Sequence, residues 1–214
     1  MSEQFQDENL VILNNNNNNN KPAAAVDIQL IIKLLKNPFE ALKLDGKKDF
    51  LYGLIGMGAS LVGYIVLVLA VSSYLKGIFF NPLAALTGVG SGTGVFIGKM
   101  ILLGILSLLS LFFSLWLISL WKGQESQSIQ ALITKLGAMQ YLSGVGFIVA
   151  GILAFMTIKL ALAIFLITLI STMIFSVQAA FQMYKVKEES SALYIVSSVG
   201  AYFIVMLILT SILM

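Results

Sequence analysis

The stretch FLYGLIGMGASLVGYIVLVLAVSSYL, residues 50–75, decides the fold because its 26 residues carry no charge. A transmembrane helix needs about 20 apolar residues to cross the hydrocarbon of a bilayer. Four more charge-free stretches follow, at 100–121, 136–158, 160–184 and 190–214. We therefore predict an all-α protein, a polytopic transmembrane helix bundle. Its five spans are expected near 50–75, 95–121, 136–157, 160–182 and 192–213.

The composition of the whole chain agrees with this prediction. Of 214 residues, 58% are hydrophobic and 11% are charged, whereas a soluble domain has roughly 45–50% apolar and about 25% charged residues. So few charges cannot cover a water-facing surface. The composition therefore indicates an integral membrane protein.

Several residue types are missing, and their absence excludes kinds of chemistry. The chain has no Cys, His or Arg, and all 13 basic residues are Lys. Thiolate chemistry, Cys/His zinc sites, haem ligation and imidazole-activated nucleophiles therefore have no residues to carry them. Without Arg, a nucleic-acid groove is not expected either. We expect no catalytic residue, no metal, no cofactor and no nucleic-acid partner.

The lysine positions predict the orientation of the bundle. With five spans, ten lysines fall on the N-terminal side and three, Lys76, Lys99 and Lys159, fall on the other. Because lysines collect on the cytoplasmic side, the N-terminus is expected in the cytoplasm and the C-terminus outside. A sixth span over 77–98 would reduce the difference to eight against five. That stretch also contains Asn81-Pro82 and several glycines, so we expect a re-entrant or flexible outer loop there.

Two further segments precede the first span. Residues 1–25 include a run of seven Asn and are expected to form a disordered Asn-rich tail. In 26–49, apolar residues recur at the spacing of one helical face, and the pattern predicts a helix. Asn37 and Pro38 then have the residue types of an N-cap and a first helical position, which predicts a second short helix.

These two interfacial helices supply the candidate site. Lysines on such helices are attracted to anionic headgroups by about 1 kcal/mol each. The alternative is that the segment packs under the bundle as an ordinary cap, and both descriptions can hold together. A second surface-lying helix is expected in 124–135. We predict lipid or partner contacts at Lys33, Lys36, Asn37, Pro38, Phe39, Lys47 and Lys48.

Inside the spans no ionisable residue lies near mid-membrane, which disfavours ion-coupled transport and catalysis. Small and uncharged polar residues are common there, and they are the usual material of helix packing in lipid. The alternative is that they line a substrate path. The polar residues are Ser107, Ser110, Ser114, Gln140, Ser143, Ser171, Thr172, Ser176, Gln178, Ser197 and Ser198. The glycines expected at close helix contacts are Gly53, Gly56, Gly58, Gly144, Gly146 and Gly151, with Gly94 and Gly98 as a GxxxG pair.

Aromatic residues near the span ends are expected to lie at headgroup level. At the inner interface these are Tyr52, Trp121, Tyr141, Tyr184 and Tyr194.

Two motifs resemble those of the Yip family, the Rab-interacting membrane proteins and their bacterial relatives. They are Leu34-Leu35-Lys36-Asn37-Pro38-Phe39-Glu40-Ala41-Leu42 before the first span and Ser128-Ile129-Gln130-Ala131-Leu132 before the third. The resemblance implies five spans, a cytoplasmic N-terminus and an interfacial stretch. It also implies a bacterial-type relative in a plasma membrane, or an ER or Golgi location for a eukaryotic one.

These observations favour a non-catalytic integral membrane protein that organises the membrane or binds a partner. The expected partners are the bilayer, its anionic headgroups at the cytoplasmic face, and a protein or a second copy of the chain. The alternative function is a small permease or transporter subunit. An intramembrane enzyme is third, because no pair of nucleophile and base can be assembled.

Overall fold

The computed structural model describes residues 26–79 and 92–213, and within these ranges every regular element is a helix. The expected Asn-rich tail and the middle of the expected outer loop lie outside the described residues. The elements are α2 (Ile28–Lys36), η2 (Pro38–Lys43), α3 (Phe50–Phe79), α5 (Gly92–Lys122), α6 (Ile129–Ala154), α7 (Ile158–Met183), η4 (Glu188–Ser190) and α8 (Ser191–Leu213).

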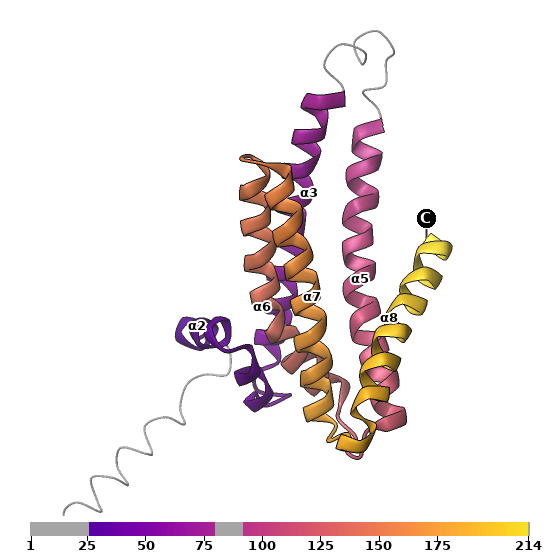
Figure 1. Ribbon diagram of the computed structural model, residues 1–214. Helices are drawn as coiled ribbons and strands as arrows, with labels where there is room; N and C mark the ends of the chain where they lie inside the picture. Colours follow the sequence, from indigo (N-terminus) through magenta and orange to yellow (C-terminus); the bar gives the residue numbers. More distant parts are fainter. Residues whose placement is uncertain (1–25, 80–91, 214) are drawn as a thin grey trace, which may run out of the picture.

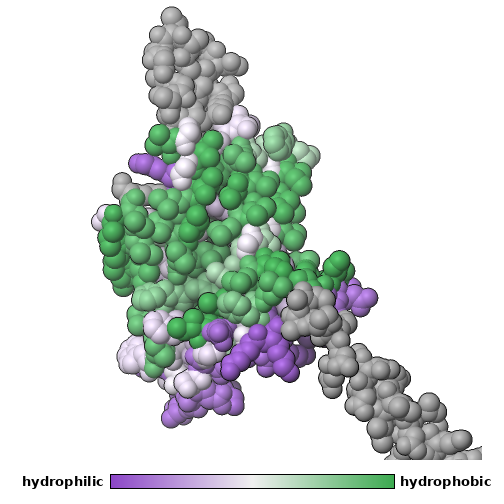
Figure 2. All heavy atoms as spheres, turned by 180° about the vertical axis from the view of Figure 1, so that it is seen from behind, coloured by the Kyte–Doolittle hydropathy of each residue, from purple (hydrophilic) through white to green (hydrophobic). Residues whose placement is uncertain are grey.

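Five of these helices, α3, α5, α6, α7 and α8, are long and apolar enough to span a membrane. They confirm the predicted all-α bundle with five candidate spans. Figure 2 shows that the surface of the bundle is mostly apolar and that its polar residues gather mainly at one end.

Two predicted boundaries are wrong. The stretch 124–135 forms no separate surface helix, because the Ser128 hydroxyl accepts a hydrogen bond from the Ala131 amide at 3.1 Å and starts α6 at Ile129. Residues 129–135 are therefore the first turns of a spanning helix. The expected outer loop over 77–98 is also shorter than predicted, since 77–79 continue α3 and 92–98 begin α5.

The spans form two groups (Figure 1). Helices α3, α6 and α7 make a three-helix group, in which α3 and α6 have the most extensive contact. Helices α5 and α8 make a pair, and α8 touches α7 only weakly. Hydroxyl groups join the pair, because Ser119 and Tyr194 share a hydrogen bond of 2.7 Å and Ser107 and Tyr202 share another of 2.7 Å.

Glycines allow the close contact of α3 and α6. A Cβ on Gly56 would overlap the Gly137 carbonyl oxygen, and one on Gly63 would overlap the Gly144 carbonyl oxygen. Backbone therefore lies directly on backbone at both levels, which is how small residues drive helix association in lipid.

The structure confirms most of the predicted glycine contacts and corrects three of them. Gly53, Gly56 and Gly144 lie in the α3–α6 contact, Gly151 borders it, and Gly146 faces Thr168 on α7. Gly58, Gly94 and Gly98 were expected at contacts but have open space at the Cβ position. Gly63 and Gly137 also lie in the α3–α6 contact but were not predicted. Gly63 follows the predicted Gly56 by seven residues, and Gly137 precedes the predicted Gly144 by seven residues.

We call the end of the bundle that carries segment 26–49 and the starts of α3, α6 and α8 the lysine-rich end. Nine described lysines lie there, at 33, 36, 43, 47, 48, 122, 135, 185 and 187, against Lys76, Lys99 and Lys159 at the other end. Figure 1 shows α2 beside this part of the bundle, next to α6.

Four tyrosines expected at headgroup level are instead buried at the lysine-rich end. Tyr52, Tyr141, Tyr184 and Tyr194 belong to one core cluster with Leu34 and other apolar residues of segment 26–49. Burial raises the pKa of Tyr184 to about 12, and neighbouring Tyr194 adds to the shift. These rings lie at the predicted end of the bundle, but they pack inside the core and are not exposed as the rings of an aromatic belt would be. Trp121 does remain exposed, with the Lys122 ammonium 4.0 Å from its ring centroid.

The glycine contact predicts a large difference between two substitutions on one helix. Gly56→Leu places a side chain against the α6 backbone, and overpacking of this kind typically costs about 1–3 kcal/mol. Gly58→Leu adds the same side chain at a position where nothing lies within 4 Å of the Cβ. We expect the thermal unfolding midpoint in detergent to fall clearly for Gly56→Leu and to stay near wild type for Gly58→Leu. Equal midpoints for the two variants would contradict the described α3–α6 contact.

Candidate functional site at the lysine-rich end

Helix α2 divides its surface between the bundle and the surroundings. Asp27 caps its start, because its carboxylate accepts a hydrogen bond from the Gln29 amide at 2.9 Å. Leu34 is almost completely buried against the bundle. Ile28 and Ile32, one helical turn apart, keep 69% and 47% of their surface exposed. The helix therefore packs against the bundle as a cap and still presents two apolar residues outward.

The turn into η2 forms as predicted. The Asn37 side-chain oxygen accepts a hydrogen bond from the Phe39 amide at 3.2 Å, and Pro38 occupies the first position of η2. This is the N-cap arrangement that satisfies an otherwise unpaired helix-start amide. The role of Asn37 and Pro38 in the structure is thus to define the turn.

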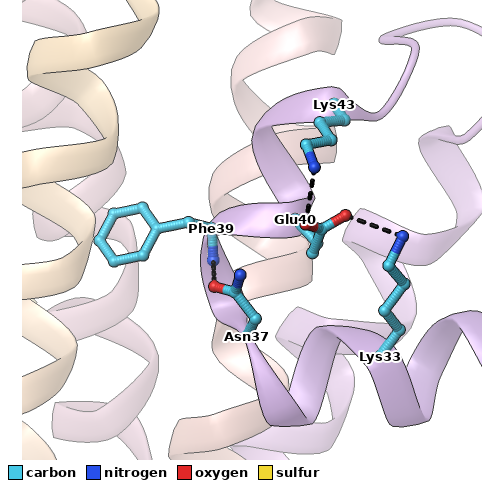
Figure 3. Close-up of polar contacts among 5 residues, drawn as sticks. All are labelled: Lys33, Asn37, Phe39, Glu40 and Lys43. Carbon is cyan, nitrogen blue, oxygen red and sulfur yellow. Dashed lines mark hydrogen bonds and ion pairs between the residues drawn. The ribbon is translucent and has the colours of Figure 1, made fainter.

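Phe39 fixes η2 to the bundle. Its ring meets the ring of Phe175 on α7 edge to face, with centroids 5.8 Å apart and planes at 82°. Figure 3 shows this ring pointing to the side opposite Lys33 and Lys43. Such aromatic pairs contribute about 0.5–1.5 kcal/mol beyond their buried area. In the described structure Phe39 packs inward, where the sequence predicted a contact with lipid or a partner.

Glu40 forms ion pairs with two of the lysines (Figure 3). Its carboxylate lies 2.7 Å from the Lys43 ammonium and 2.9 Å from the Lys33 ammonium. The hydrogen bonds from Lys43 and then Lys33 hold the pKa of Glu40 below its usual value. Lys33 is therefore paired across the α2–η2 turn. The sequence analysis missed Glu40 and Lys43, although their spacing of three residues is typical of a helical ion pair.

The loop after η2 presents Lys47 and Lys48 outward. The Asp45 carboxylate accepts hydrogen bonds from the amides of Lys47 and Lys48, each at 2.9 Å. These two bonds lower the pKa of Asp45. The Gly46 carbonyl accepts a further hydrogen bond from the Thr134 hydroxyl on α6 at 3.0 Å. The backbone under both lysines is thus fixed, and the two side chains are exposed.

The seven predicted site residues therefore divide into two sets. Lys36, Lys47 and Lys48 are exposed, and in the described ranges they form no ion pair. We call these three residues the free lysines. Lys33, Asn37, Pro38 and Phe39 hold the segment together. The exposed Ile32 was not on the predicted list, but it lies one turn before Lys36 and on the same face of α2.

The polar residues of the spans do not form one common group. Gln140, Ser143, Ser171, Thr172 and Ser176 line a cavity of about 250 Å³ between α6 and α7. Ser110 does not line this cavity, and its hydroxyl lies 3.7 Å from the Met206 sulfur on α8. Gln178 is exposed on the outer face of α7. Ser107, Gln140 and Thr172, from three different spans, line a second cavity, whereas Ser110 and Gln178 line neither of the two.

In the described ranges, Asp and Glu residues nowhere gather in threes as metal ligands would. The helices and the docked segment define the class of the protein: an integral membrane protein with a helical bundle and a basic, partly apolar surface at one end. Searches against known protein families, curated proteins and solved structures give no match for the chain.

The Glu40 ion pairs predict a titration. Because the folded pKa of Glu40 is lowered, the pairs stabilise the docked segment above the unfolded pKa, and this contribution is lost as the pH falls through the folded pKa. We expect the side-chain carbon signal of Glu40 in NMR to titrate with a midpoint below 4.5. Lys43→Gln should raise that midpoint more than Lys33→Gln, and Lys36→Gln should leave it unchanged. A midpoint at or above 4.5 in the wild type would refute the pairs.

Proposed function

We propose that this chain is a non-catalytic five-span membrane protein that organises the membrane or binds a partner through segment 26–49. The observation that carries the proposal is the set of free lysines, Lys36, Lys47 and Lys48. They project from a segment that Phe39, Thr134 and Leu34 attach to the bundle. A surface with a fixed backbone, whose lysines form no ion pair within residues 26–79 and 92–213, suits recognition of anionic groups.

The surroundings of the free lysines support contact with lipid headgroups. Ile28, Ile32 and Lys36 follow one another at four-residue steps along the exposed side of α2. An apolar stripe that ends in a lysine matches the boundary between acyl chains and anionic headgroups. Each lysine near such a surface contributes about 1 kcal/mol.

The orientation and location belong to the same proposal. The lysine-rich end faces the cytoplasm, as the excess of lysine indicates, and the C-terminus lies outside. The Yip-like motifs support a bacterial plasma membrane, with an ER or Golgi membrane as the location for a eukaryotic relative. A protein partner, or a second copy of the chain, would meet the same surface.

Reversing the charge of the free lysines tests the proposal. We expect Lys36→Glu/Lys47→Glu/Lys48→Glu to reduce the phosphatidylglycerol retained by the purified protein, relative to phosphatidylcholine, at least tenfold in native mass spectrometry. Lys99→Glu/Lys159→Glu, at the other end, is the matched control and should retain wild-type selectivity. Crosslinking in native membranes from Lys36→Cys should capture the partner. Unchanged lipid selectivity together with no crosslinked product would end the proposal.

The orientation has its own test, because a chain without Cys takes single labels cleanly. A membrane-impermeant maleimide should reach Lys47→Cys only after the cytoplasmic side is opened. It should reach Lys159→Cys in intact cells, since this position lies at the other end of the bundle. Labelling of Lys47→Cys in intact cells would show the reverse orientation.

A further inference from the structure

A cavity of about 430 Å³ lies between the three-helix group and the α5–α8 pair. All five spanning helices contribute to its lining. Its volume falls in the range of small-molecule sites, roughly 300–1,000 Å³. Its walls are mostly apolar, and no Asp, Glu or Lys side chain lines it. Such a site suits an uncharged ligand.

The cavity opens sideways toward lipid. Its lining includes Leu166 and Ile170 on α7 and Phe203 on α8, and each of these side chains keeps more than half of its surface exposed. Helices α7 and α8 touch only weakly, and α8 leans away from α7 toward its C-terminus (Figure 1). A ligand dissolved in the bilayer can therefore enter between these two helices without passing through water.

One residue of the lining, which also borders the smaller cavity between α6 and α7, carries a polar group without a partner in the described ranges. Gln140 on α6 is 1% exposed, and its Nε2 amide has no hydrogen-bond partner within the described structure. Leaving a buried donor unpaired costs free energy, so such a group calls for an acceptor. Of the buried side-chain atoms without a partner in the described ranges, the Gln140 amide alone belongs to a residue that lines this cavity.

Three aromatic rings form one wall of the cavity. Tyr64, Phe147 and Phe165 lie with ring centroids 5.7, 5.9 and 6.5 Å apart. The Tyr64 hydroxyl donates a hydrogen bond to the Met100 carbonyl at 3.1 Å, which holds its ring in place. Packed rings favour a further ring in offset or edge-to-face contact. A planar ligand is therefore favoured over a simple chain.

The geometry points to a binding site for a neutral, lipid-soluble molecule that carries a planar ring with a carbonyl oxygen, as a quinone does. The ring packs against Tyr64, Phe147 and Phe165, the carbonyl accepts the hydrogen bond of Gln140 Nε2, and the apolar tail leaves between α7 and α8. This site is independent of the free lysines and of their proposed role.

Decylubiquinone is the probe that tests the site, with the full-length protein in phosphatidylcholine nanodiscs. We expect it to raise the thermal unfolding midpoint in a saturable way. Dodecylbenzene, which has a ring and a chain but no carbonyl, should raise it much less at the same mole fraction. Gln140→Leu should weaken the apparent affinity for decylubiquinone about three- to tenfold, as expected for the loss of one hydrogen bond. Gln178→Leu removes the same group from the outer face of α7 and should bind as wild type.

Two results would overturn the site. One is an equal response of the wild type to decylubiquinone and dodecylbenzene, which would identify a non-selective space for apolar chains and needs no variant. The other is equal affinity of Gln140→Leu and wild type for decylubiquinone. Should Gln140→Leu unfold without probe, Gln140→Met takes its place, and Met206→Trp, which fills the cavity from α8, should abolish the response.

Discussion

The direct contact of the α3 and α6 backbones is the constraint on which the rest of the structure depends. Because glycines remove the side chains between these helices, α6 lies at the centre of the bundle and is the most buried of the five spans. Its first turns receive segment 26–49 through Thr134 and Ala131. Its middle carries Gln140 into the cavity. One helix therefore supports both the basic surface and the apolar site.

The spans could be predicted from the sequence because the cost of burying charge in lipid is large and local. A charge-free run of sufficient length has few alternatives to a spanning helix. The N-cap at Asn37 was also predictable because it is local. Its side chain accepts a hydrogen bond from the amide of Phe39, only two residues along the chain. Helix ends were less predictable. Ser128 starts α6 earlier than charge counting suggests, because a cap acts regardless of the hydropathy that follows it.

Pairings between distant segments could not be predicted from the sequence. The Phe39 ring appeared available for lipid until the position of Phe175 on α7 was known. The four tyrosines had the composition of an aromatic belt, but they pack in one core cluster with residues of other helices and of segment 26–49. Gly58 and Gly56 look equivalent in sequence and differ only in which face of α3 meets α6. In each case the deciding fact is a neighbour many residues away, which periodicity does not reveal.

The α3–α6 contact also has a consequence for how the chain assembles during synthesis. Helix α5 follows α3 in sequence, yet the glycine face of α3 is covered by α6. After α3 and α5 have entered the bilayer, that face stays in contact with lipid until α6 has been synthesised. The central contact of the mature bundle is thus formed late, and a chain that ends before Ile133 would lack it altogether.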